Sequence, residues 1–365
     1  MVCLCVDPSQ LLYALGIEPN VYHASMKDHD ILPTQVENSS LLTLGMIGAG
    51  HMGTLHARNL MADARVHIVG VTDVVPDRAE ALARLCQGRT FANVEALLEA
   101  GVEAVYVCTP NALHTEAVLT ALQRHVHVFS EKPMATTLRE ARQILEATRT
   151  SRACYQVGHN RRFAPVYTFA KQQMLAGFVP TSANIKMNRG ELKHPPWVAD
   201  TRLTGGFLYE STVHLLDMMR WLLGEIVAVE CRARASVYSE LDDFVMLFTC
   251  ASGQHCVFSS CAHTSWAFPF ERIELYGDHA QIVTEEMEKV SHAPGLGQPI
   301  VQHDFFQLDI PDKWGYREED TRFVDAILAG TIPSVTAEDG YKAVELVEAC
   351  YLSAQHNGER LRLPL

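Results

Sequence analysis

Short apolar runs alternate with amphipathic segments between residues 41 and 163. Apolar runs of this length are typical of buried strands, and spacings of three and four between apolar positions are typical of helices. Strands that alternate with helices predict a parallel, doubly wound sheet. The predicted strands are 42–47, 66–72, 102–108, 126–129 and 153–157, and the predicted helices are 54–61, 76–85, 94–100, 114–124 and 138–148.

The pattern changes after residue 163. Four segments alternate between apolar and polar positions as strands do, at 227–237, 244–250, 255–263 and 272–276. Two later segments, 316–328 and 338–356, have helical periodicity, and we expect them to pack back on this second sheet.

The chain has 365 residues, a length that favours two domains over one. We expect a nucleotide-binding domain over 41–163 and a second, α+β domain over 164–365. Residues 1–40 have mixed composition without the pattern of a signal peptide, and we interpret them as an extension of unknown role.

Unusual polar clusters follow the predicted strands of the first half. Gly48-Ala49-Gly50-His51-Met52-Gly53 follows the first strand, Thr109-Pro110-Asn111 follows the third, and Glu131-Lys132-Pro133 follows the fourth. In a doubly wound sheet the ligand binds beyond the carboxyl ends of the strands. The sequence therefore predicts one site that collects these clusters.

The glycine cluster has the spacing GxGxxG between a strand and a helix, which is the setting of a dinucleotide-binding turn. Gly48 permits the tight turn, Gly50 lets a pyrophosphate approach the backbone, and Gly53 lets helix and strand pack closely. We expect His51 and Met52 to line the cofactor too, because the helix N-terminus binds phosphate. Asp73 would bind the adenosine ribose and repel a 2′-phosphate, so the sequence predicts NAD rather than NADP.

Two further clusters carry candidate catalytic groups. Lys132 is held extended by Pro133, and its ammonium group is suited to stabilise negative charge on a substrate oxygen. Glu210, His214 and Asp217 are spaced to share one face of a predicted helix, and a histidine beside carboxylates is a suitable general base. Taken singly, a lysine or histidine is more often a surface residue, so these assignments depend on the set as a whole.

Composition excludes several classes of protein. The chain is 48% hydrophobic with a net charge of −13, which excludes a disordered chain and argues against a nucleic-acid partner. No apolar stretch reaches the ~20 residues of a membrane helix. The ten cysteines contain no CxxC pair, which indicates a reducing compartment, and we expect the cytoplasm. We interpret Cys250, Cys256, Cys261, His255 and His263 as sheet residues, and expect no metal site.

Together these motifs resemble the glucose–fructose oxidoreductase, inositol dehydrogenase and MocA family. The resemblance covers roughly residues 41–365 and also includes Asn160-Arg161-Arg162-Phe163 and Gly205-Gly206 before His214. It implies a nicotinamide cofactor, a second domain with a large, mostly antiparallel open sheet, and substrates that are sugars or cyclic polyols. A sheet with one exposed face also leads us to expect a homodimer or homotetramer.

The resemblance assigns roles residue by residue. It implies that Lys132 and His214 are catalytic, and that Glu210 stands where the family's dehydrogenases commonly have an aspartate. The added methylene changes the reach of that carboxylate by ~1.5 Å. Arg161 and Trp197 are expected to contact the substrate together with Glu210 and His214. The expected cofactor-lining residues outside the glycine turn are Thr109, Pro110, Asn111, His114, Glu131 and Lys132.

Three functions remain open at the level of sequence. The first is an NAD-dependent dehydrogenase that acts on a secondary alcohol of a sugar or inositol-like cyclitol. The second is an NAD-retaining glycosidase or epimerase that acts by transient oxidation. The third is a non-catalytic NAD-binding sensor, which the presence of Lys132 and His214 disfavours.

Overall fold

The apolar strands of the first half form a six-stranded parallel sheet with the order β3-β2-β1-β4-β5-β6. This is the strand order of a Rossmann fold, as the sequence predicts. The computed structural model describes residues 41–267 and 269–365, so the predicted extension at 1–40 lies outside the described residues. The strands are β1 (Leu42–Ile47), β2 (Val66–Thr72), β3 (Arg89–Thr90), β4 (Ala104–Val107), β5 (His127–Glu131) and β6 (Tyr155–Gly158).

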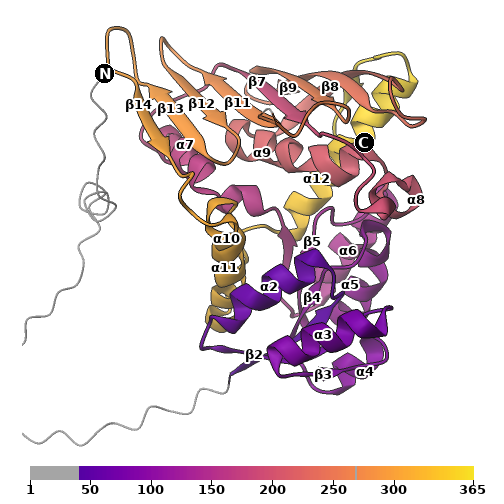
Figure 1. Cartoon of the computed structure of the whole chain (residues 1–365). Helices are drawn as coiled ribbons and strands as arrows, with labels where there is room; N and C mark the ends of the chain where they lie inside the picture. Colours follow the sequence, from indigo (N-terminus) through magenta and orange to yellow (C-terminus); the bar gives the residue numbers. More distant parts are fainter. Residues whose placement is uncertain (1–40, 268) are drawn as a thin grey trace, which may run out of the picture. The chain divides into compact units, whose positions relative to one another are not determined.

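Helices cover both faces of this sheet (Figure 1). Successive strand residues point to opposite faces, so Tyr106 and Phe129 belong to one buried cluster while Val105 and Val128 belong to the other. Asn93 and Thr137 cap two of the helices with their side chains. The helices are α2 (His51–Met61), α3 (Pro76–Cys86), α4 (Val94–Glu99), α5 (His114–Gln123) and α6 (Leu138–Thr150).

The second half forms a nine-stranded sheet with the order β14-β13-β12-β11-β7-β10-β9-β8-β15. All neighbouring strands are antiparallel except β7 and β10, which confirms the mostly antiparallel sheet. The strands are β7 (Ser182–Asn188), β8 (Ile226–Arg234), β9 (Asp243–Cys250), β10 (His255–Cys261), β11 (Glu271–Tyr276), β12 (Gln281–Glu285), β13 (Lys289–Ala293), β14 (Val301–Asp304) and β15 (Leu361–Arg362).

Sequence patterning predicted only β8 to β11 of this sheet. The missed strand β7 has the sequence Ser-Ala-Asn-Ile-Lys-Met-Asn, in which buried apolar residues alternate with polar ones but only Ile185 is of a type that favours strands. Its position in the sheet, between β10 and β11, stabilises it as a strand. Tertiary packing commonly overrides a weak local preference in this way.

Helices α7 (Pro165–Leu175), α9 (Val213–Leu223) and α12 (Ala337–Gln355) pack against the second sheet or its helices (Figure 1). Helix α11 (Tyr316–Ala329) does not, which corrects our expectation. It packs on α2, and its Phe323 and Val324 are buried with core residues of the Rossmann sheet. The short elements are η1 (Asn111–Leu113), η2 (Asn160–Phe163), η3 (Pro196–Ala199), α8 (Thr201–Thr204), the π turn η4 (Leu208–Thr212) and α10 (Ile310–Lys313).

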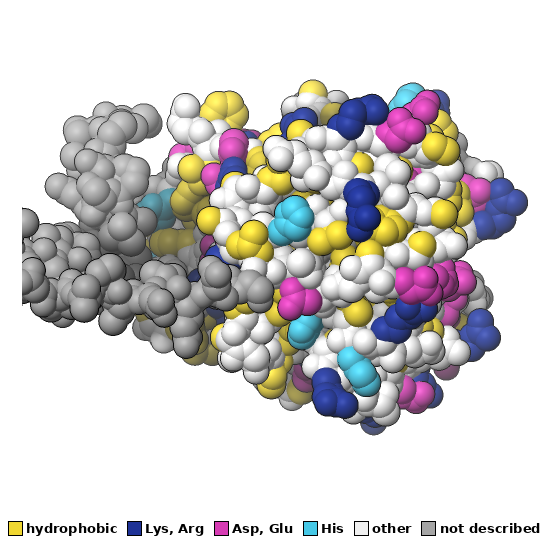
Figure 2. Space-filling view, turned by 90° about the horizontal axis from the view of Figure 1, so that it is seen from below, with side chains coloured by type: hydrophobic (Ala, Val, Ile, Leu, Met, Phe, Trp, Pro, Cys, Tyr) yellow, Lys and Arg dark blue, Asp and Glu magenta, His cyan; other side chains and the backbone are white. Residues whose placement is uncertain are grey.

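Residues 41–365 form one compact unit that includes both sheets. On the face seen in Figure 2, acidic and basic side chains are interspersed with apolar and histidine side chains. Within the described residues, no helix combines the length and the apolar character needed to cross a membrane.

Candidate active site

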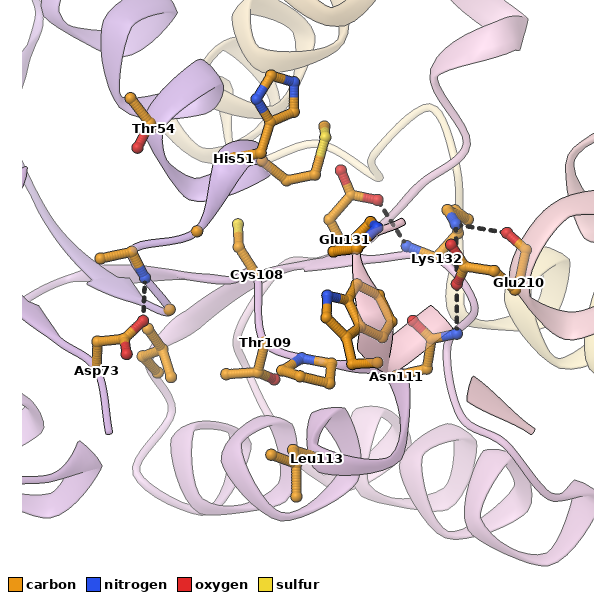
Figure 3. A pocket seen from close by; sticks show the side chains of 18 of the residues that line it. His51, Thr54, Asp73, Cys108, Thr109, Asn111, Leu113, Glu131, Lys132 and Glu210 are labelled. Carbon is orange, nitrogen blue, oxygen red and sulfur yellow. Dashed lines mark hydrogen bonds and ion pairs between the residues drawn. The ribbon is translucent and has the colours of Figure 1, made fainter. Parts of the chain in front are cut away.

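A cavity of about 1140 Å³ lies at the carboxyl ends of the parallel strands (Figure 3). One part of its wall comes from the glycine turn and the ends of β2, β4 and β5. The other part comes from the π turn η4, the end of β7 and the segments around Trp266 and Trp314. The cavity therefore brings together residues from both halves of the chain.

The glycine turn leaves room for a bound group. Gly48 has φ +97°, and a side chain there would meet the Cys108 carbonyl oxygen at 2.6 Å. A Cβ on Gly53 would lie 2.1 Å from the Gly48 carbonyl oxygen, so this glycine serves helix–strand packing and does not line the cavity. A Cβ on Gly50 meets nothing within 4 Å.

The first turn of α2 is free to bind an anion. Gly50 is the N-cap residue, and no side chain caps the helix. The first N–H groups of a helix have no partner within the helix, and they attract phosphate. Gly50, His51 and Met52 all line the cavity, so a pyrophosphate fits the open space at this turn.

Asp73 lies at the end of β2 and lines the same cavity. Its carboxylate accepts the Ala49 N–H at 2.6 Å (Figure 3) and the Val75 N–H at 2.8 Å. A carboxylate offers about four acceptor positions, so positions remain for ribose hydroxyls. Arg78, in the first turns of α3, also lines the cavity. The sequence analysis did not include this cation, because Arg78 lies in the helix that follows the strand and not at the strand end.

Lys132 extends from the end of β5 toward the π turn. Its Nζ donates to the Glu210 carbonyl oxygen at 2.9 Å and lies 3.9 Å from Glu210 Oε2. Asn111 Nδ2 donates to the same Oε2 at 2.9 Å (Figure 3). The Glu210 carboxylate also lies 3.8 Å from an Arg189 guanidinium nitrogen. The motifs around Asn111 and Lys132 thus meet at Glu210.

His214 lies at the start of α9 and lines the cavity. Its Nδ1 is buried and has no hydrogen-bond partner among the described residues. Burial, reinforced by the positive charges of Arg161 and Lys132, holds the pKa of His214 well below its usual value. The imidazole is therefore neutral at neutral pH and is able to accept a proton.

Asp217 does not join Glu210 and His214 in the cavity, contrary to the predicted common helix face. Its carboxylate accepts two hydrogen bonds from Arg162, at 2.8 and 2.6 Å, and does not line the cavity. The expectation assumed a regular α-helix, whereas residues 208–212 form a π turn. A π turn changes which residues align along a helix.

His114 was expected to line the cofactor, but it is fully buried and does not line the cavity. Its Nδ1 lies 2.8 Å from the Pro133 carbonyl oxygen and its Nε2 lies 2.9 Å from the Thr109 carbonyl oxygen. The ring points into the protein because it bridges these two loops. Thr109, Pro110, Asn111, Glu131 and Lys132 do line the cavity.

The expected substrate residues Arg161 and Trp197 also line the cavity. Arg161 is already paired with Glu271, with 2.9 Å between Nη2 and Oε2. Arg189, directly after β7, also lines the cavity. Sequence reasoning missed several other lining residues, because they lie far apart in sequence and share no spacing. These residues are Ser211, Trp266, Phe270, Trp314 and Tyr316.

The cysteines and histidines of β9 and β10 do not form a cluster. Cys250 and Cys256 are buried in the second sheet, whereas His255 is exposed. Across residues 41–267 and 269–365, no group of three or more His, Cys, Asp or Glu side chains is arranged to hold a metal ion.

A Rossmann sheet whose glycine turn opens onto a cavity with a lysine and a neutral histidine defines a nicotinamide-dependent oxidoreductase. Residues 42–159 match the family model described as an oxidoreductase family with an NAD-binding Rossmann fold. Residues 179–363 match the model for the C-terminal alpha/beta domain of that family. The chain belongs to the glucose–fructose oxidoreductase, inositol dehydrogenase and MocA family, and its cofactor is NAD.

Similar proteins include inositol 2-dehydrogenases. The chain is 28% identical to that of Rhizobium meliloti (strain 1021), over 85% of this chain and 96% of the relative. It is 31% identical to that of Streptomyces avermitilis, over 90% and 96%. Among solved structures, a putative myo-inositol dehydrogenase from Sinorhizobium meliloti 1021 has a TM-score of 0.76 at 26% identity, over 88% of this chain and all of that one.

Proposed function

We propose that this protein oxidises a secondary alcohol of a sugar, a sugar derivative or an inositol-like cyclitol, with NAD as the hydride acceptor. The observation that best supports this function is that Lys132, Glu210 and His214 line the same cavity, onto which the glycine turn opens. The inositol 2-dehydrogenases among its relatives support the substrate class.

In this proposal each polar group has a separate role in the reaction. Bound NAD supplies the hydride acceptor. The Lys132 ammonium, held at the Glu210 carbonyl, stabilises the negative charge that develops on the substrate oxygen. Neutral His214 accepts the hydroxyl proton, a step that typically contributes ~10²–10⁴-fold. The Glu210 carboxylate, between Asn111 and Arg189, orients the ammonium and binds a neighbouring substrate hydroxyl.

The residues proposed to bind NAD also have separate roles, each toward a different part of the cofactor. The α2 N-terminus, with Gly50, His51 and Met52, would bind the pyrophosphate. Asp73 would bind the adenosine ribose. The residues that would flank the nicotinamide end are Thr109, Pro110, Asn111 and Glu131. Arg161 and Trp197 would border the substrate on the far side.

The test is NADH formation, measured by absorbance, with NAD or NADP against a panel of inositols, hexoses, sugar acids and glycosides. Turnover with NAD on a polyol is the expected result. NAD that stays bound, with substrate conversion but no net NADH, would instead favour the cofactor-recycling glycosidase or epimerase. Binding of NAD without conversion of any panel member would favour the sensor.

We further propose a cytoplasmic homodimer or homotetramer that associates through the outer face of the nine-stranded sheet. Val245, Leu247 and Val257 are exposed on adjacent strands β9 and β10, which forms an apolar centre on that face. The eight cysteines within the described residues are all free thiols, which supports a reducing compartment. A purely monomeric native mass at micromolar protein would contradict the assembly.

A further inference from the structure

Behind Lys132, away from the cavity, lies a buried polar cluster that the proposed reaction does not use. His56 of α2 is fully buried, with Nε2 3.0 Å from Glu131 Oε1 and Nδ1 2.7 Å from Asp320 Oδ1. Asn59 donates to the second oxygen of Asp320 at 2.8 Å. Both partners of the ring are carboxylates, which accept when ionised, so both ring nitrogens donate and the ring is an imidazolium.

This cluster reaches Lys132 through Glu131. The second carboxylate oxygen of Glu131 accepts the Lys132 backbone N–H at 3.0 Å (Figure 3). The Lys132 side chain then donates to the Glu210 carbonyl. A series of hydrogen bonds therefore runs from Asp320 on α11, through His56 on α2 and Glu131, to the backbone N–H of Lys132, the residue whose ammonium lies in the cavity.

We propose that His56 is a positioning residue that sets the placement of the Lys132 ammonium by holding the Glu131 carboxylate. The proposal rests on the proposed role of Lys132. Without the imidazolium, Glu131 Oε1 has no other hydrogen-bond partner among the described residues, and the carboxylate is free to turn toward the neighbouring ammonium. That turn would draw Lys132 away from the Glu210 carbonyl, and a 1 Å misplacement of a catalytic group is able to cost ~10²-fold.

The electrostatic balance of the cluster supports this role. Burial opposes the charge on His56, but Asp320 and Glu131 raise its pKa well above the usual value. Burial alone would raise the pKa of Glu131, but the His56 hydrogen bond and charge, with Lys132, bring it below the usual value. Neither carboxyl oxygen of Glu319 has a hydrogen-bond partner within residues 41–267 and 269–365, and burial together with the Glu131 charge raises its pKa well above the usual value, which favours the neutral acid.

Aromatic rings enclose the imidazolium. The rings of Phe129, Tyr106 and Tyr316 lie 5.0, 5.5 and 5.9 Å from it, centroid to centroid. They surround the imidazolium with apolar surface. A polar group with no partner in such surroundings is costly, so His56 acts as a fixed support and not as an exchangeable contact.

The experiment compares the wild-type protein with His56→Gln, with Asp320→Asn, and with His67→Gln as a control at an exposed histidine. Three quantities are measured: kcat on the polyol found above, the Kd of NAD by protein fluorescence, and the labelling rate of Lys132 by an amine-selective reagent. Mass spectrometry reads the labelling, and the exposed Lys193 serves as internal reference. Asp320→Asn keeps the proposal testable if His56→Gln fails to fold.

We expect the cluster variants to lower kcat by about 10-fold or more while the Kd of NAD stays within about threefold. Lys132 should become labelled at a rate at least about threefold different from wild type. In a Lys132→Ala background, His56→Gln should change the residual kcat by less than about twofold, because the group through which it acts is gone.

An unchanged labelling rate of Lys132 in folded His56→Gln and Asp320→Asn would overturn the proposal, whatever the activity. Equal fractional losses of kcat in the wild-type and Lys132→Ala backgrounds would also overturn it. If the wild-type protein turns over no polyol, a changed labelling rate would still support the positioning role, while the proposed function itself would fail.

Discussion

Lys132 stands between two buried histidines in opposite surroundings. Behind it, His56 is bonded to two carboxylates, and its pKa lies well above the usual value. In front, His214 has burial and the cations Arg161 and Lys132 around it, and its pKa lies well below the usual value. The two rings are similarly buried, so neighbouring charge and hydrogen bonding decide which is an imidazolium and which is a base.

The difference in charge between His56 and His214 suits one ring to a structural role and the other to proton transfer. A buried imidazolium between carboxylates cannot accept a proton, but it fixes both partners in place. A buried neutral imidazole with an unpartnered Nδ1 has no structural partner to lose, and it is available to a substrate proton. In our proposals the same residue type therefore serves two purposes within one site.

The largest expected effect is on stability, from His56→Phe. This change leaves the Glu131 and Asp320 carboxylates buried without their cation, which costs about 3–5 kcal/mol of the free energy of unfolding. Because folding raises the pKa of His56, its contribution is fully present below the unfolded pKa and is lost as the pH rises through the folded one. The deficit should therefore shrink at alkaline pH. Urea unfolding across pH measures it, with His67→Phe as control, and a deficit under about 1 kcal/mol would refute the charged cluster.

The next effect is on turnover, from Lys132→Ala or His214→Ala. Each should lower kcat at least ~100-fold while the Kd of NAD changes little, because neither side chain is proposed to bind the adenosine or the pyrophosphate. Steady-state kinetics and fluorescence titration check both statements. Wild-type turnover in either variant would remove that residue from the proposed reaction.

A smaller loss is expected from Glu210→Asp. Shortening the side chain draws the carboxylate away from Asn111 Nδ2, now 2.9 Å distant, and away from the ammonium. We expect a fall in kcat of about 10-fold, the order of effect of a modest misplacement. Asn111→Ala, assayed alongside, should give a loss in the same range, since it breaks the same contact. An undiminished kcat in Glu210→Asp would show that turnover does not depend on the longer reach of the glutamate side chain.

The smallest effect is a shift in a pH profile. Because burial and nearby cations lower the pKa of His214, the acid limb of kcat/KM should lie below pH 6.5, the usual histidine value. Arg189→Gln removes one of those cations. The acid limb of kcat/KM should then move upward by ~0.3 pH units. An acid limb above pH 6.5 in the wild-type protein would mean that another group limits the reaction.

Local motifs made the cofactor end of the site predictable. The glycine turn begins directly after β1, Asp73 directly follows β2, and the Glu131-Lys132-Pro133 segment begins with the last residue of β5. A parallel sheet collects its carboxyl ends at one edge, so their meeting follows from the pattern alone. His114 lies in the same kind of motif but points inward, since spacing does not specify the direction of a ring.

The part of the cavity that we propose for the substrate was less predictable. Trp266, Phe270 and Trp314 come from connections around the second sheet and from the turn before α11, and nothing in their spacing associates them with Lys132. The π turn at 208–212 likewise separates Asp217 from Glu210, although a regular helix would align them. Such features depend on packing between distant segments.

The sequence by itself determined the alternation of strands and helices in the first half, the dinucleotide-binding turn and the candidate residues Lys132 and His214. These features depend on local periodicity and on backbone rules for glycine and proline. Only the tertiary structure decided the charge states of His56 and His214 and the composition of the substrate end. Charge states and cavity walls depend on which side chains meet through space, and the chain brings them together only when its two sheets pack as one unit.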